Sequence, residues 1–381
     1  MAPNDRALGA QRRVITGGTG FVGSHFALGC CRAGNAPIAL ARGASEMAAR
    51  ERVTHALGAA ERSLGDDRTP YAPLPLVLVA DLAQRACGIS GEALSRLQRS
   101  QPEQFWHFAA SLRYEDRHRA QIFESNLQGT LHALELAKAS GCSTFVYVST
   151  AYSAGKQRGF VAERLHDGAE GFNNAYEDSK ARTEHTVADF CAREGLSFAV
   201  LRPSIVIGPY ATKSTGGSST GLYGFLREVS QVAAALRALG RPVEINGDPS
   251  TLCNLIPVDW FIDDVFAILE QGLRDGSVYH NTCERPLTIA QVGEVVASAL
   301  EIPGFDIQHR ATLLSPLEQR LARRTAFYGG YFSNSKHFLR ERPCARELSR
   351  LDLSDYVRQF LAELGAPTLG SAQASSVRVE A

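Results

Sequence analysis

The 381-residue sequence lacks any long apolar run and any excess of charge of one sign. No stretch approaches the roughly 20 apolar residues that a membrane-spanning helix needs, and residues 1–13 contain no apolar core of signal-peptide length. The 40 basic and 40 acidic side chains cancel, which gives no reason to expect nucleic acid or an anionic membrane as a partner. We therefore expect a cytoplasmic chain without a membrane span, in which any charged ligand is held by a local site.

Paired cysteine motifs are also absent. The cysteines are scattered through apolar or mixed segments, with no C-x-x-C pair and no histidine at the spacing of a metal site. This distribution predicts reduced thiols and no bound metal. The cysteines are Cys30, Cys31, Cys87, Cys142, Cys191, Cys253, Cys283 and Cys344.

Short apolar runs alternate with helix-like segments over the first half of the chain. This alternation predicts an α/β fold, a doubly wound parallel Rossmann sheet with helices on both faces and the ligand at the carboxyl ends of the strands. The run LPLVLVADL is expected to be buried on both faces. The predicted strands are 13–16, 37–41, 74–82, 105–110, 143–150 and 197–208, and the longest predicted helices are 44–60, 116–140 and 176–195.

The regular alternation stops after Gly208. A Gly/Ser/Thr segment at 210–223 predicts a mobile loop that closes over the substrate. Helices at 224–239 and 290–300, mixed with short strands, predict a smaller substrate-binding lobe that is partly interwoven with the sheet. The expected organisation is a flexible amino terminus (1–11), a cofactor-binding domain with the catalytic residues (12–208), a mixed α/β lobe (209–365) and a disordered tail (366–381).

Three glycines follow the first predicted strand directly. Gly17, Gly20 and Gly23 form G-x-x-G-x-x-G at the mouth of a predicted helix, where missing side chains let a pyrophosphate approach the backbone amides and the positive helix end. This position in the first strand–helix unit predicts a dinucleotide site. The residues expected to bind the cofactor are Gly17, Thr19, Gly20, Phe21, Val22, Gly23, Arg42, Arg52, Asp81, Leu82, Ala109, Ala110, Asn126, Tyr176, Lys180, Pro203 and Ser204.

The end of the second predicted strand distinguishes the two nicotinamide dinucleotides. An acidic side chain there accepts a hydrogen bond from the ribose 2′-hydroxyl, whereas an arginine accommodates a 2′-phosphate. The segment PIALAR ends in Arg42 without an acidic residue, and Arg52 follows in the next helix, so we predict NADP(H). Asp81 ends the third strand, where its carboxylate either meets the adenine amino group or caps the next segment.

Tyr176 and Lys180 form a Y-x-x-x-K pair at the start of a predicted helix. Because the two side chains lie one turn apart on one face, we expect the lysine charge to lower the pKa of the phenol. The phenol can then give a proton to a carbonyl oxygen that receives hydride. Thr150, at the end of FVYVST, can donate a hydrogen bond to the same oxygen, and its neighbour Ser149 could replace it.

Two further polar residues lie in the same region. Asn126 belongs either to a polar relay or to helix packing, and His107 is expected to pack near the cofactor rather than to transfer protons. The predicted helices 116–140 and 176–195 could pair across a two-fold axis in a homodimer, although core packing explains the same periodicity.

Six segments, TGGTGFVG, HFAAS, NLQGT, VSTAY, YEDSK and RPSIVIG, together resemble the extended short-chain dehydrogenase/reductases over about residues 12–270. The resemblance implies a dinucleotide fingerprint, a catalytic Ser/Thr, Tyr and Lys, and a stretch that lines the nicotinamide. In that order, the residues are Gly17, Gly20 and Gly23; Thr150, Tyr176 and Lys180; and Pro203 and Ser204.

Within that superfamily the sequence is most similar to the thioester reductase and fatty acyl-CoA reductase branch, the male-sterility type. The passages ARGASEMAARERV, STAYSAGKQRGFVAERLHDGAEGFNNAYEDSKARTEH and NLIPVDWFIDDV carry this similarity. The VYG and the acidic residue after the second strand that sugar-nucleotide epimerases usually show are missing. The resemblance implies that hydride passes from NADPH to an acyl thioester on coenzyme A or a carrier protein, which releases an aldehyde and leaves further reduction to an alcohol open.

Two other functions stay open. An extended-type enzyme that acts on a ketone, a secondary alcohol or a nucleotide sugar would use the same residues with a different pocket. A non-catalytic NADP-binding regulator would keep the fold, although such proteins tend to lose the tyrosine or the lysine, and both are present here. No adenylation or carrier segment accompanies the reductase-like sequence, so a thioester reductase of this kind would receive its acyl group from another protein or coenzyme.

Overall fold

A computed structural model of the chain describes residues 12–65, 74–309, 314–342 and 351–365. Its centre is a seven-stranded sheet in the order β12-β7-β5-β4-β1-β2-β3, and every neighbouring pair is parallel. The predicted doubly wound parallel sheet is therefore confirmed. Its strands are β1 (Arg13–Thr16), β2 (Ile38–Ala41), β3 (Leu76–Val79), β4 (Gln104–His107), β5 (Thr144–Val148), β7 (Ser197–Pro203) and β12 (Ser277–Asn281).

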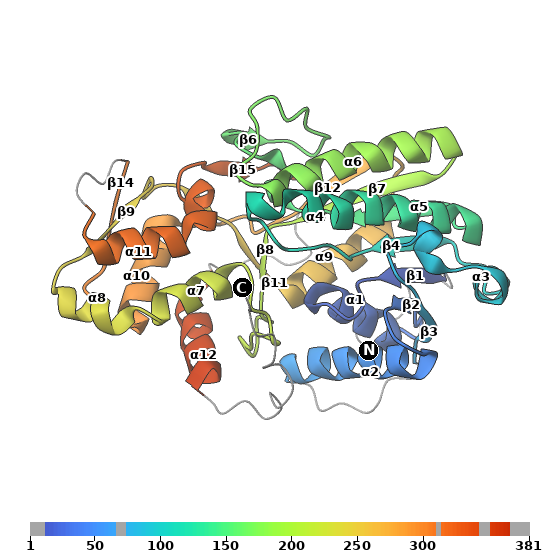
Figure 1. Cartoon of the computed structure of the whole chain (residues 1–381), viewed down its shortest axis with the longest axis horizontal. Helices are drawn as coiled ribbons and strands as arrows, with labels where there is room; N and C mark the ends of the chain where they lie inside the picture. Colours follow the sequence, from blue (N-terminus) through green and yellow to red (C-terminus); the bar gives the residue numbers. More distant parts are fainter. Residues whose placement is uncertain (1–11, 66–73, 310–313, 343–350, 366–381) are drawn as a thin grey trace, which may run out of the picture.

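Helices cover both faces of this sheet (Figure 1). One cluster of buried apolar side chains joins one face of the sheet to α1, α2 and α9, and a second cluster joins the other face to α3, α5 and α6. Side-chain caps fix where two of the helices begin: Ser45 accepts a hydrogen bond at the start of α2, and Asn174 does so at the start of α6. The bounds are α1 (Phe21–Arg32), α2 (Glu46–Ser63), α3 (Gly91–Arg99), α5 (Gly129–Ser140), α6 (Ala175–Glu194) and α9 (Val258–Gln271).

The residues after Gly208 form a second lobe with an apolar core of its own. Its helices lie beside the Rossmann half in Figure 1, with the short strands β9 and β14 at the far end. The chain nevertheless returns to the main sheet, because α9 packs against α1 and β12 extends the sheet next to β7. The elements of the lobe are α7 (Leu222–Ser230), α8 (Ala233–Leu239), β9 (Val243–Asn246), β10 (Leu252–Cys253), β13 (Leu287–Thr288), α10 (Ile289–Ala299), β14 (Phe305–Gln308), α11 (Pro316–Arg324), η6 (Ala326–Phe332) and α12 (Leu353–Gly365).

Three predicted elements are interrupted in the structure. The predicted helix 116–140 comprises η3 (Asp116–His118), α4 (Arg119–Phe123), the π-helical turn η4 (Glu124–Gln128) and α5. The predicted strand 197–208 divides at Ser204, after which β8 (Ile205–Ile207) pairs with β11 (Leu255–Pro257) outside the main sheet. The predicted helix 224–239 divides into α7 and α8. The spacing of apolar residues does not show where the backbone of a helix or strand changes its hydrogen-bonding partners, so the sequence did not predict these breaks.

The third strand also differs from expectation, and the Gly/Ser/Thr loop has contacts that its sequence did not indicate. β3 is an edge strand of the sheet, and Val79 is 36% exposed, so this continuous apolar run is not buried on both faces. In the loop predicted to be mobile, Thr212 Oγ1 donates a hydrogen bond to the Ser63 carbonyl at 2.5 Å, and Thr215 Oγ1 donates one to Glu363 Oε2 at 2.5 Å. The segments predicted to be flexible at 1–11 and disordered at 366–381, and Cys344, lie outside the described residues.

Candidate active site

The glycine turn between β1 and α1 leaves no room for side chains. Gly17 has a φ of +71°, and a Cβ there would lie 2.6 Å from the Ala109 backbone nitrogen. A Cβ on Gly23 would lie 2.3 Å from the Gly17 carbonyl oxygen. No side chain caps the amino end of α1, so its first backbone amides face the cavity that Gly20 and Phe21 line. This arrangement fits a bound phosphate group, as the sequence pattern predicts.

Two arginines and one aspartate line the same cavity. The side chains of Arg42 and Arg52 are exposed, and neither makes a hydrogen bond or an ion pair with another side chain in the described part of the chain. Asp81 follows β3 and uses its carboxylate locally, because Oδ1 accepts from the Ala83 amide at 3.1 Å and Oδ2 from Gln84 at 3.3 Å. The capping role weighed for Asp81 is therefore present, and two free guanidinium groups are available for an anion.

Helix α6 carries the Tyr/Lys pair into the cavity. Tyr176 is half-buried in its first turn, and Lys180 lies one turn further on and is 2% exposed. Lys180 Nζ donates to the Val148 carbonyl at 2.7 Å and lies 4.3 Å from the centre of the Tyr147 ring. Thr150, after β5, lines the same cavity as the pair. The structure thus brings the three predicted catalytic residues together.

The pKa values of the pair differ from the expectation that the lysine makes the phenol more acidic. Burial, and then the charge of Glu177, raises the pKa of Tyr176 above its ordinary value. Burial lowers the pKa of Lys180 to about 7, although the charge of Glu184 opposes this shift. Without a ligand, Tyr176 is therefore a neutral phenol, the form that can donate a proton, and Lys180 changes charge near neutral pH.

A buried ion pair lies behind the catalytic residues. Glu184 and Arg202 are 1% and 0% exposed, and Arg202 Nε donates to Glu184 Oε1 at 2.9 Å. Although burial opposes ionisation, the Arg202 charge and its hydrogen bonds hold the pKa of Glu184 below its usual value. Ser149 Oγ donates to the same carboxylate at 2.5 Å. Ser149 is thus engaged by Glu184, which leaves Thr150 as the better placed hydroxyl for a substrate.

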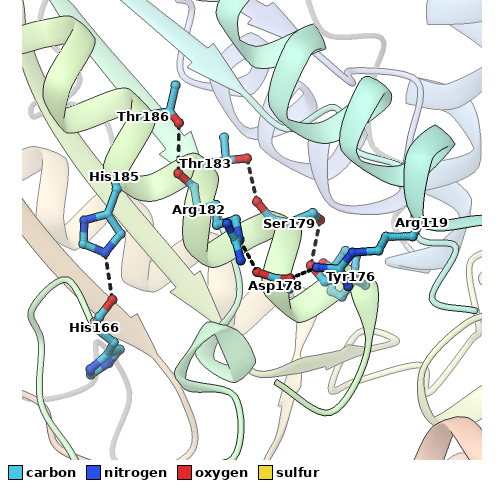
Figure 2. A network of polar contacts seen from close by, with 9 residues as sticks. All are labelled: Arg119, His166, Tyr176, Asp178, Ser179, Arg182, Thr183, His185 and Thr186. Atoms are coloured by element: carbon cyan, nitrogen blue, oxygen red, sulfur yellow. Dashed lines mark hydrogen bonds and ion pairs between the residues drawn. The ribbon is translucent and has the colours of Figure 1, made fainter. Parts of the chain in front are cut away.

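Hydrogen bonds around the first turns of α6 hold Tyr176 in place (Figure 2). Asp178 pairs with both Arg119 of α4 and Arg182 one turn along α6, and Ser179 Oγ donates to the Tyr176 carbonyl at 2.7 Å. Asn126 Nδ2 donates to Ser179 Oγ at 2.9 Å. The polar contacts therefore connect α6 to the segment before α5.

Asn126 and His107 are both buried within the protein. Asn126 Oδ1 accepts from the Ser111 amide at 2.6 Å, and Asn126 lies in the π-helical turn η4 but does not line the cavity. His107 makes hydrogen bonds with Thr16 at 2.7 Å and Thr130 at 3.1 Å, and burial lowers its pKa to about 3. Both ring nitrogens of His107 are occupied, so its contacts are those of a neutral packing residue.

The cavity has a volume of about 980 Å³ and continues past Tyr176 into the second lobe. There its wall is made largely of apolar side chains from α7, α10, β9, β11, β14 and η6. Of the predicted site residues, only Asn126 is absent from the lining. The apolar wall comprises Phe225, Ile245, Leu255, Ile289, Val292, Phe305, Ile307, Phe327 and Phe332.

Sequence reasoning missed this wall and two phenols near the catalytic pair. Tyr152 and Tyr331 line the cavity with their ring centres 4.6 Å apart. Tyr331 comes from η6, more than a hundred residues after the Tyr/Lys motif, and no local pattern marks it. The AY that follows Thr150 was a signal that could have indicated Tyr152.

The described ranges hold neither a metal-site arrangement nor a membrane-spanning helix. Within the described ranges, no group of three or more His, Cys, Asp or Glu side chains is arranged to hold a metal ion. Seven cysteines of this part are buried free thiols. None of its helices combines the length and apolar character needed to cross a bilayer.

Comparisons of sequence match the chain to a protein family and to a curated relative. The family described as male sterility protein matches residues 15–265. UDP-glucose 4-epimerase from Bos taurus is 27% identical over 247 residues, which cover 60% of this chain and 63% of that relative. The chain thus spans less than two thirds of the length of the curated relative that it matches.

Solved structures with the same fold include a domain from a biosynthetic pathway and an epimerase. The terminal R domain from the myxalamid PKS-NRPS biosynthetic pathway aligns with a TM-score of 0.71 at 18% identity, covering 94% of this chain and 93% of that one. UDP-glucose 4-epimerase from Thermus thermophilus in complex with NAD aligns with a TM-score of 0.53 at 22% identity, covering 94% and 100%. At these identities the likeness shows a common fold.

Proposed function

The chain belongs to the male sterility protein family of extended short-chain dehydrogenase/reductases, and from this membership we propose that it is an NADPH-dependent reductase of acyl thioesters or of the derived aldehydes. The observation that carries the choice of substrate is the apolar wall of the cavity beyond Tyr176. An apolar acyl chain gains free energy by leaving water for such a wall, whereas a sugar hydroxyl needs hydrogen-bonding partners there.

The residues of the cofactor cleft fit a phosphorylated dinucleotide. The glycine turn and the uncapped amino end of α1 suit the pyrophosphate, and the free guanidinium groups of Arg42 and Arg52 suit a 2′-phosphate. When bound, NADPH supplies the hydride. Supporting contacts are assigned to Thr19, Val22, Leu82, Ala109, Ala110, Pro203 and Ser204, which line the same cavity.

The reaction requires one hydride and one proton for each reduction. Hydride adds to the thioester carbonyl carbon, and the phenol of Tyr176 gives its proton to the carbonyl oxygen, which forms a hemithioacetal. The carbon–sulfur bond of the hemithioacetal then breaks and releases an aldehyde and a free thiol. Thr150 donates a hydrogen bond to the oxygen while its negative charge develops. The ammonium of Lys180 would stabilise the phenolate that Tyr176 becomes after it gives its proton, and it would hold the nicotinamide ribose.

NADPH oxidation with different acceptors tests the proposal. We expect turnover with acyl-CoA as sole acceptor and a large loss, about 100- to 10,000-fold, when Tyr176 is replaced by Phe, because the proton donor is gone. NADPH binding, followed by fluorescence, should be retained in Tyr176→Phe. Tyr279→Phe is a matched control, because it removes the hydroxyl of a buried tyrosine outside the cavity lining.

The bovine epimerase relative favours a second candidate, an extended-type enzyme that acts on a nucleotide sugar or a ketone. Turnover with such a substrate and none with any thioester would reject the thioester proposal. A non-catalytic NADP-binding regulator is the third reading, and unchanged cellular function of Tyr176→Phe would favour it. A carrier protein as acyl donor and a homodimer remain parts of the proposal to be measured.

A further inference from the structure

One arginine in the lobe has no partner for its charge. Arg227 lies on α7, is half-buried and lines the cavity, yet its guanidinium makes no hydrogen bond or ion pair with any described residue. The neighbouring cavity residue Arg324 differs, because its guanidinium is paired with Glu228. A half-buried charge loses part of its hydration, and a counter-ion offsets that loss. The geometry therefore indicates an anion from outside the chain.

Arg227 lies at the edge of the cavity-facing stripe of α7. Residues Gly221, Gly224, Phe225 and Glu228 follow the i, i+3, i+4, i+7 spacing of one helix face, and all of them line the cavity. Burial raises the pKa of both Tyr114 and Tyr328, and the nearby charge of Glu228 adds to the shift in each phenol. Glu228 thus lies near a phenol of each half of the molecule, and Arg227 directly precedes it on α7.

We propose that the Arg227 guanidinium binds the phosphate of the phosphopantetheine arm that carries the acyl thioester. The inference rests on the proposed function and names the part of the substrate that the apolar wall does not recognise. A planar guanidinium can bind two phosphate oxygens at once. These charge-assisted hydrogen bonds are stronger where the site is partly shielded from water. The same phosphate occurs in coenzyme A and on carrier proteins, so the chemistry is shared by both donors.

The cofactor phosphates are served by other residues. Arg42 and Arg52 follow β2 and lie beside the glycine turn, whereas Arg227 belongs to a helix of the second lobe. Replacing Arg42 by Ala should weaken NADPH binding without changing the discrimination between thioesters with and without phosphate. Replacing Arg227 by Ala should do the reverse.

Two thioesters of one acyl group test the proposal: acyl-pantetheine and acyl-4′-phosphopantetheine. With the wild-type chain, we expect kcat/KM to be roughly 10- to 100-fold higher for the phosphorylated substrate, the effect of one charge-assisted bidentate contact. Arg227→Ala should reduce this ratio to about one, mainly through KM, and Arg227→Lys should retain part of it. Arg237→Ala is the matched control, since Arg237 is an exposed arginine of the next helix that does not line the cavity.

Further measurements identify the acyl donor and distinguish failure of the anion site from failure of the proposed function. A larger loss for Arg227→Ala with acyl-CoA assigns the phosphate to coenzyme A, and a larger loss with an acyl carrier protein assigns it to the carrier; either supports the proposal. Equal losses with both pantetheine substrates would overturn it. If the wild-type chain reduces no thioester, the proposed function fails, and calorimetry with 4′-phosphopantetheine then decides: binding lost in Arg227→Ala supports the anion site, and no binding to the wild type rejects it.

Discussion

Three ionisable side chains follow one face of α6 at intervals of one turn. Tyr176, Lys180 and Glu184 become progressively more buried along the helix, from half-buried to almost fully buried. Glu184 stabilises the ammonium of Lys180, while its own charge is balanced by Arg202. The protonation of Lys180 therefore depends on a balance between lost hydration and one nearby carboxylate.

This balance predicts an alkaline limb in the pH profile. Because burial lowers the pKa of Lys180 to about 7, the ammonium is present below that pH and is lost as the pH rises through it. If the charged form is needed, kcat/KM for the thioester falls about tenfold per pH unit above this value, since kcat/KM reports the free enzyme. Tyr176 stays a protonated phenol along this alkaline limb, because burial raises its pKa.

Measurement of kcat/KM from pH 5.5 to 9.5 checks this prediction. Glu184→Gln removes the carboxylate that favours the ammonium, so the midpoint should move to lower pH. A profile that stays flat to pH 9.5 in the wild type would argue against a role for the charged lysine.

At the scale of elements, the Gly/Ser/Thr loop connects the two halves beside the cofactor cleft. Thr212 bonds the carboxyl end of α2, and Thr215 bonds Glu363 near the end of α12. Ser218, a few residues along, lines the cavity. The loop is thus a strap whose order depends on a helix from the carboxyl-terminal part of the lobe.

Replacing Glu363 by Gln should loosen this strap. The hydrogen bonds that Thr215 gives to a charged acceptor become bonds to a neutral amide, so local opening of residues 212–221 should increase about 5- to 30-fold. Hydrogen exchange followed by mass spectrometry measures this opening. Asp355→Asn is the control on the same helix, because Asp355 pairs with Arg358 and not with the loop. Equal exchange of residues 212–221 in the two variants would show that the Glu363 carboxylate does not hold the loop.

At the scale of the whole molecule, the boundary expected at residue 208 does not separate two independent bodies. Phe266 of α9 lies in the core beneath the sheet, and the lack of a side chain at Gly29 lets α9 approach α1 closely. β12 covers the outer edge of β7. Both elements follow the lobe in the chain, so the Rossmann half is completed by residues far beyond its predicted end.

A fragment of residues 12–208 should therefore not fold alone. The fragment lacks five large apolar side chains of α9 that lie in the core. Their burial contributes on the order of 10 kcal/mol to the free energy of unfolding, which is comparable to the total stability of a domain. Circular dichroism should show no cooperative thermal transition for the fragment, and mixing it with residues 209–365 should restore one. A cooperative transition of the isolated fragment near that of the full chain would contradict this. The five side chains are Trp260, Phe261, Ile262, Val265 and Phe266.

The amphipathic stripes of the longer helices are explained within one chain. Leu134 of α5 and Val187 of α6 are fully buried in the core cluster above the sheet, and the exposed positions of α6 include Arg182 and His185. Core packing therefore accounts for the periodicity that we considered for a homodimer. Dimerisation stays a prediction that sedimentation can test.

The sequence by itself determined the features that depend on local chemistry. Gly17 and Gly23 are required wherever a phosphate-binding turn brings two backbones together, and the spacing of Tyr176 and Lys180 places them on one helix face in any fold. The alternation of short apolar runs with helix-like segments predicted the parallel sheet, because strands that helices cover on both faces carry apolar side chains on both faces. These signals are short in sequence and can be recognised without coordinates.

Only the tertiary structure decided what distant segments do together. The breaks at Asn126 and Ser204 and the apolar wall arise where side chains meet partners far away in sequence, and only the described cavity shows that Arg227 faces it without a partner. Such contacts leave no periodic pattern and no fixed spacing in the sequence, because the residues that meet lie far apart along the chain. The pKa of Tyr176 followed the same rule: burial, which the sequence does not record, raises it, and the charge of Glu177 adds to the shift.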